Sequence, residues 1–80
     1  FNPATTIVYD VANTSDISIS VYNSLGRQVR QLVDRRQSPG HYKVIWDGRD
    51  DQGGRLSSGV YLVIFSHDNG QQVQKTTLIQ

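Results

Sequence analysis

Hydrophobic and polar residues alternate along most of the chain with a period of two, which is the spacing of a β-strand with one buried face. The clearest run covers residues 17–22, where isoleucine or valine takes every second position and serine or tyrosine lies between. The same alternation predicts strands over residues 5–11 and 42–46. Each of these strands is expected to bury one face and leave the other in water.

Three further strands are expected from less regular patterns. In residues 27–33 the apolar side chains change phase at Leu32, which predicts a bulge or an early strand end. Residues 59–67 form the most continuous apolar stretch and predict a central strand covered on both faces. Residues 71–79 are polar enough to form a last strand at the edge of a sheet.

Polar segments rich in turn residues separate these strands. Residues 34–40 are expected to form an exposed loop, and residues 47–54 a second loop that holds three glycines. A short seventh strand is possible around Arg55-Leu56. Short strands joined by turn signals at this spacing predict an all-β fold, an immunoglobulin-like β-sandwich of six to seven antiparallel strands.

The composition supports this fold and narrows the function. Glutamate is absent, alanine occurs twice, and valine, isoleucine and threonine together fill 20 of the 80 positions, a bias that favours strands over helices. A net charge of +1 argues against a nucleic-acid partner, and no apolar run approaches the ~20 residues of a membrane-spanning helix, so we expect no membrane insertion. With Phe1 first and no methionine, residues 1–80 are expected to be one domain cut from a larger protein.

Catalytic chemistry has little support in the sequence. The two histidines, His41 and His67, both lie at the ends of predicted strands, where a solvated imidazole is ordinary. No Gly-x-Ser-x-Gly nucleophile motif is present, and so short a chain leaves little room for a substrate pocket. We therefore expect a protein that is not an enzyme and that needs no cofactor.

Three aspartates gather in the second polar loop: Asp47, Asp50 and Asp51. Several carboxylates on a flexible turn can bind calcium, but this spacing lacks the alternate aspartates and closing glutamate of an EF-hand loop. In the favoured interpretation Asp47 bonds its own loop backbone in an Asx-type turn, while Gly48, Gly53 and Gly54 supply unusual φ angles. Calcium binding is the alternative interpretation.

Two side-chain groups could form a binding surface. Trp46 shares the phase of Tyr42 and Val44, so a place in the core is favoured over a sugar-stacking platform. Five basic residues could form a patch across two neighbouring strands, although a solvated sheet face is the favoured interpretation. These five are Arg27, Arg30, Arg35, Arg36 and Lys43.

A series of short motifs runs along nearly the whole chain. They are Phe1-Asn2-Pro3, Thr5-Thr6-Ile7, Tyr9, Val21-Tyr22-Asn23, Leu25-Gly26-Arg27, Val29, Trp46-Asp47-Gly48, Gly53, Ser58-Gly59-Val60-Tyr61 and Lys75. In this order and spacing they resemble the C-terminal sorting domains of the type IX secretion system. The central structural motif of this resemblance consists of Trp46, Asp47, Gly48, Gly53, Gly59 and Tyr61. Much of the pattern is also similar to the immunoglobulin-like domain of the flagellar hook-capping protein.

The resemblance implies a non-catalytic sorting domain at the C-terminal end of a larger exported protein. Its partners would be a covalently attached N-terminal cargo domain, the outer-membrane secretion translocon and a surface protease that acts like a sortase. The protein would cross the periplasm of a Gram-negative bacterium and reach the cell surface or be secreted. Alternatives are a structural or accessory module of an extracellular enzyme, a module of the flagellar hook cap and a carbohydrate-binding module.

Addition of a partner strand to the last strand is the docking mode expected for such a domain, because that strand is polar, terminal and expected at an edge. The candidate docking residues are Lys75, Thr76, Thr77, Leu78 and Ile79. The oligomeric state is left open by the sequence.

Overall fold

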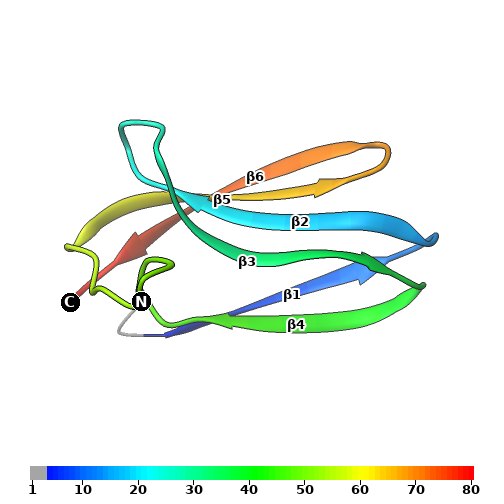
Figure 1. The fold of residues 1–80 in the computed structure, drawn as a ribbon, viewed down its shortest axis with the longest axis horizontal. Helices are drawn as coiled ribbons and strands as arrows, with labels where there is room; N and C mark the ends of the chain where they lie inside the picture. The colour runs from blue at the N-terminus through cyan, green and yellow to red at the C-terminus, as the bar shows by residue number, and fades with distance from the viewer. Residues whose placement is uncertain (1–3) are drawn as a thin grey trace.

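The computed structural model describes residues 4–80, and within that range it contains six β-strands and no helix (Figure 1). The strands are β1 (Thr5–Val11), β2 (Ser15–Tyr22), β3 (Gln28–Gln37), β4 (Gly40–Trp46), β5 (Gly59–His67) and β6 (Gly70–Leu78). All of their pairings are antiparallel. The structure therefore confirms the all-β fold, and the motif Phe1-Asn2-Pro3 lies outside the described residues.

Two sheets of unequal size face one another. The smaller sheet pairs β1 with β4, and the larger has the order β3-β2-β5-β6. Figure 1 shows the smaller sheet as a separate layer against the larger one. Because β6 has β5 as its one neighbour in this order, the predicted edge position of the last strand is confirmed.

The core lies between the two sheets and follows the alternation in the sequence. Ile17, Ile19 and Val21 all point inward from β2, whereas Ser18 and Tyr22 lie on the outer face and are partly exposed. The remaining apolar members come from the other strands. They are Val11, Val33, Trp46, Tyr61, Val63 and Leu78. Trp46 is fully buried, so its predicted place in the core is confirmed.

β3 carries the predicted bulge but not the predicted early end. Ile19 of β2 pairs with Val33, and the next residue of β2 pairs with Gln31, so Leu32 is the extra residue. After the bulge β3 continues to Gln37, because β2 begins at Ser15 and pairs with β3 along this whole length. The expected loop over residues 34–40 is therefore wrong, and the connection to β4 shrinks to residues 38–39.

Two other expectations from the sequence are wrong. Around Arg55 the described chain forms one isolated bridge, to Arg49, rather than a seventh strand. The central strand β5 is buried on one face, at Tyr61 and Val63, but Val60 on its other face is 43% exposed. Both strands of the smaller sheet, β1 and β4, lie on the same side of β5, so the outer face of the larger sheet is in contact with solvent.

The last strand offers a direct test of this burial, since Leu78 is 0% exposed and its neighbour Ile79 is 54% exposed. Leu78→Ala should lower the free energy of unfolding by about 2–5 kcal/mol, because it removes buried methyl groups and leaves a cavity. Ile79→Ala, the matched control, should change it by about 0.5 kcal/mol or less. Urea denaturation of the two variants measures both values, and equal effects would contradict the observed inward and outward placement.

Candidate functional site

Trp46 ends β4 and joins the core to the loop that follows it. Its ring meets the ring of Tyr61 edge-on, with centroids 5.6 Å apart and planes at 70°. Its indole N–H donates a hydrogen bond of 3.1 Å to the backbone carbonyl of Arg49. The buried ring therefore has its polar atom satisfied by the loop, as a buried indole requires.

Asp47 holds the first turn of this loop. Its carboxylate accepts the backbone N–H of Arg49 at 3.1 Å, which is the Asx-type bond that the sequence predicts. The same oxygen accepts a charged hydrogen bond of 3.1 Å from Arg30 of β3, and Arg30 also donates to the Arg49 carbonyl at 3.0 Å. Because the Asp47 side chain is 49% exposed, we expect this anchor to contribute less than a buried one.

Asp50 and Asp51 also bond backbone groups. Asp50 accepts the N–H groups of Gln52 and Gly54 at 3.0 and 2.8 Å, and Asp51 accepts the N–H of Gln31 in β3 at 3.0 Å. Among residues 4–80 there is no group of three or more histidine, cysteine, aspartate or glutamate side chains placed to hold a metal ion. This geometry favours the structural interpretation of the three aspartates over calcium binding.

The glycines of the motif have distinct roles. Gly48 and Gly53 have φ angles of 77° and 85°, so these two turns need residues without a side chain, as predicted. The same expectation is wrong for Gly54, which has no positive φ. A Cβ atom at Gly54 would lie 3.1 Å from an Asp50 carboxylate oxygen, so glycine there allows the close approach of this side chain.

The two remaining motif residues lie where β5 begins. Gly59 opens β5 opposite Leu78 of β6. The Tyr61 hydroxyl donates a hydrogen bond of 2.7 Å to the Ser57 carbonyl, which fixes the segment that leads into the strand. Together with Trp46, Tyr61 therefore ties both ends of the loop over residues 47–58 to the core.

The candidate docking residues of β6 do not share one environment. Lys75 and Thr77 pair with Leu62 and Val60 on the outer face of the larger sheet, and both are exposed. Ile79 follows the strand and is exposed as well, whereas Thr76 lies on the opposite face and is partly buried. Leu78 is corrected: it is fully buried in the core, so its side chain offers no docking surface.

The basic residues do not form the patch considered from the sequence. Arg30 pairs with Asp47, and Arg36 pairs with Asp16 at 3.2 Å. Lys43 lies on β4, which belongs to the other sheet. Arg27 lies in the connection before β3, so the five residues are spread over a loop and two sheets, and two of them already have acidic partners.

The two histidine side chains bond to nearby exposed groups. His41 lies opposite Asp10 on the outer face of the smaller sheet, and its Nδ1 atom bonds the Asp10 carboxylate. This hydrogen bond, followed by the attraction between the two charges, raises the pKa of His41 above its ordinary value of 6.5. The Nδ1 atom of His67 accepts the backbone N–H of Asn69 at 3.3 Å.

Two facing antiparallel sheets around a buried tryptophan define a small immunoglobulin-like β-sandwich, a class of domain that is typically non-catalytic. The profile of the FlgD Ig-like domain family matches residues 3–71, and the chain belongs to this family. No curated protein matches the chain. Within residues 4–80, no helix has the length and apolar character needed to cross a membrane.

A solved structure with a similar fold is that of PorZ, described as an essential bacterial surface component of the type-IX secretion system of human oral-microbiomic Porphyromonas gingivalis. The superposition has a TM-score of 0.62 at 20% sequence identity. It covers 91% of this chain and 11% of PorZ, so the chain corresponds to a small part of that protein. At this identity the likeness shows a shared fold.

The Asp47 turn can be tested by two substitutions. Asp47→Ala should lower the free energy of unfolding by about 1 kcal/mol, because it removes the acceptor of the Arg49 N–H and the partner of Arg30. Asp47→Asn keeps an acceptor oxygen and should lose less. Chemical denaturation measures both, with Asp34→Ala, an exposed change on β3, as control. If the Asp47→Ala protein is as stable as the parent, this result contradicts the role of Asp47 as an anchor of the loop.

The His41–Asp10 pair predicts a dependence of stability on pH. Since the pKa of His41 is raised in the folded state, the pair stabilises the fold fully below pH 6.5, and this contribution is lost as the pH rises through the raised pKa. Asp10→Asn should return the pKa of His41 toward 6.5. The ring resonances of His41, followed by NMR across pH, measure this shift, and Asp34→Asn serves as control. A pKa of His41 that Asp10→Asn leaves unchanged contradicts the assigned cause.

Proposed function

We propose that this domain is the non-catalytic C-terminal sorting domain of a larger exported protein, which it directs through the type IX secretion system to the cell surface. The observation that carries the proposal is the ordered set of motifs from Thr5 to Lys75, set on the described sandwich. The shared fold with part of PorZ, a surface component of that system, supports it. The domain would act at the envelope or outside a Gram-negative bacterium after passage through the periplasm.

The exposed edge of β6 is the surface best suited to engage the outer-membrane translocon. Its backbone groups on the side away from β5 can pair with a partner strand, with hydrogen bonds of the main chain and contacts of alternate side chains both contributing to docking. Exposed Lys75, Thr77 and Ile79 would then select the partner. The surface protease that acts like a sortase would meet the domain after export and release it from the N-terminal cargo domain.

The family match favours one other function. Immunoglobulin-like domains of the FlgD family include the module of the flagellar hook cap, so a structural or accessory role in a larger assembly is the second candidate. In that role the domain would space or orient its neighbours and would not direct export.

A transplant experiment distinguishes these functions. Residues 1–80 are fused to the C-terminus of a periplasmic reporter in a host that has the secretion system, and surface display is measured by protease accessibility of intact cells. The sorting function predicts display of the fusion. Retention of an intact, folded fusion in the periplasm contradicts that function and favours a structural module.

Point variants then test the β6 edge without unfolding the domain. Lys75→Glu combined with Thr77→Glu and Ile79→Glu changes exposed positions and should reduce display at least about tenfold, a change that corresponds to about 1.4 kcal/mol of docking energy. Val8→Glu with Ile45→Glu, on the outer face of the smaller sheet, is the matched control and should leave display unchanged. Normal display of the β6 variant would locate docking elsewhere on the domain.

A further inference from the structure

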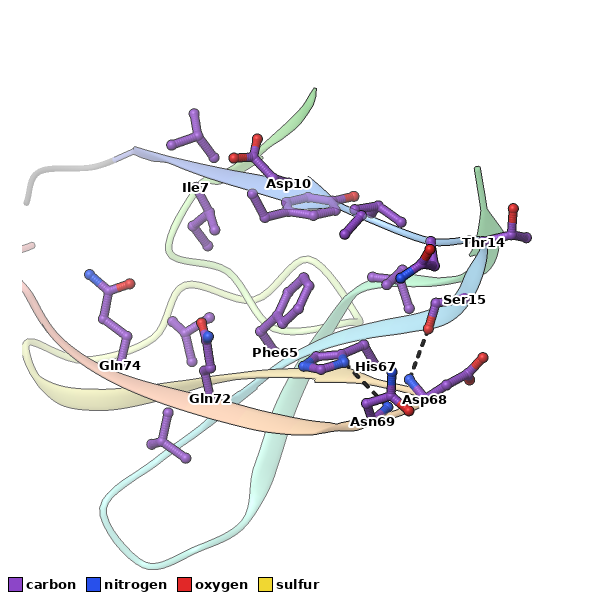
Figure 2. Close-up of a pocket in the computed structure, with 18 residues that line it drawn as sticks. Ile7, Asp10, Thr14, Ser15, Phe65, His67, Asp68, Asn69, Gln72 and Gln74 are labelled. Carbon is purple, nitrogen blue, oxygen red and sulfur yellow. Dashed lines mark hydrogen bonds between the residues drawn. The ribbon is translucent and has the colours of Figure 1, made fainter. Parts of the chain in front are cut away.

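The smaller sheet covers part of the larger one and leaves a groove beside β1. The groove has a volume of about 860 Å³ and is lined by β1, the turn after it, β5 and β6. Figure 2 shows Ile7 of β1 and Phe65 of β5 pointing toward one another across it, while Gln72 and Gln74 rise from β6 on the same side. The floor is therefore apolar and the far wall carries amide groups.

The position of this groove is that of an additional strand in the smaller sheet. The rings of Tyr9 and Phe65 are 5.3 Å apart, so β1 lies over β5. A strand added at the usual spacing of about 4.8 Å beside β1 would then lie over β6. Within the described chain β1 pairs with β4 alone, so its other edge can accept such a strand.

The side chains of β6 also indicate what the groove accepts. Gln72 and Gln74 pair with Phe65 and Val63, so they occupy the side of β6 that faces the interior of the sandwich. Both are exposed, because no strand of the described chain covers them. Glutamine amides donate and accept hydrogen bonds, and they can bond the backbone or the polar side chains of an added strand.

Charge restricts the occupant further. The acidic residues that line the groove are Asp10 and Asp68, and no lysine or arginine lines it. Figure 2 shows the Asp10 side chain directed away from the groove, and this carboxylate bonds His41. The Asp68 carboxylate at one end is 46% exposed, accepts the backbone N–H of Asp16 at 3.2 Å and forms an ion pair of 3.9 Å with Arg36. Arg36 also pairs with the Asp16 carboxylate at 3.2 Å, so two carboxylates share one guanidinium and this end keeps a net negative charge. A basic side chain at that end is favoured and an acidic one is disfavoured.

A second folded copy of this chain does not fit the groove through its own β1. If the β1 edges of two copies paired, their smaller sheets would join into one continuous sheet. Both larger sheets would then lie on the same face of this joined sheet, because both cores face in the same direction. Each β6 extends beyond β1, so the two β6 strands would occupy the same space. A single extended segment meets no such conflict.

We propose that the groove binds one extended peptide segment of another polypeptide, which pairs with the free edge of β1 as a third strand. Apolar side chains at every second position of this segment rest on Ile7 and Phe65, and a basic side chain lies beside Asp68. This site is separate from the β6 edge and does not depend on the sorting function. A peptide that binds here completes the smaller sheet and covers the inner face of β6.

The test is an NMR titration of ¹⁵N-labelled protein of residues 1–80 with the capped peptide Lys-Val-Thr-Val-Thr-Val-Lys, whose terminal lysines allow either strand direction. We expect saturable shifts in β1 and around Phe65 and Gln72. The peptide Glu-Val-Thr-Val-Thr-Val-Glu should bind more weakly, because its charges meet Asp68.

Variants on the two faces of β6 give a matched comparison. Gln72→Arg with Gln74→Arg places cations on the groove wall and should weaken binding of the lysine peptide at least about tenfold. Gln71→Arg adds a cation on the outer face of the same strand and should leave binding unchanged. All three positions are exposed, so the variants should fold like the parent.

Three results would overturn the proposal. The first is an absence of saturable shifts at millimolar peptide. The second is binding that shifts the free edge of β6 and spares β1, or that survives Gln72→Arg with Gln74→Arg. The third is a panel of neutral oligosaccharides that shifts Phe65 and Gln72 when the peptide does not, which would make the groove a sugar site.

Discussion

The burial of Trp46 is the interaction on which the rest of this small domain depends. Its ring is the largest fully buried side chain between the two sheets, and its N–H donates to the carbonyl of Arg49 in the following loop. Arg30 bonds the same carbonyl and also bonds Asp47. Core packing and loop conformation are therefore coupled, because a displaced indole would leave a buried donor unsatisfied and remove a fixed point of the loop.

The unequal size of the two sheets accounts for most of the surface properties. The two strands of the smaller sheet cover the inner faces of β2 and β5 and the last residues of β6, where Leu78 is buried, but they leave Gln72 and Gln74 uncovered. The first part of β6 accordingly carries Gln72 and Gln74 even on the side that faces the interior. The same inequality leaves the backbone edges of β1 and β6 without neighbouring strands, and such edges are where strands from other chains can add.

The sequence predicts the strands better than it predicts their extent and their neighbours. The alternation in residues 17–22 and the phase change at Leu32 correctly identify β2 and the bulge, because both are local consequences of one buried face. The segment Asp34-Arg35-Arg36 has the composition of a loop but is a strand, since its pairing with β2 is a tertiary interaction that composition does not record. The sequence places Leu78 among the docking residues for the same reason, because the burial of Leu78 depends on the opposing sheet and not on the pattern around it.

The same limit explains why no pattern in the sequence identifies the groove beside β1. Ile7 and Phe65 are 58 positions apart, and each by itself has the ordinary signature of a core residue. What makes them line an open groove is the absence, within the described chain, of a strand over β6. A surface of this kind arises from backbone edges and from positions left uncovered by the sheet order, so a domain with a thin core can offer a docking surface without a deep pocket.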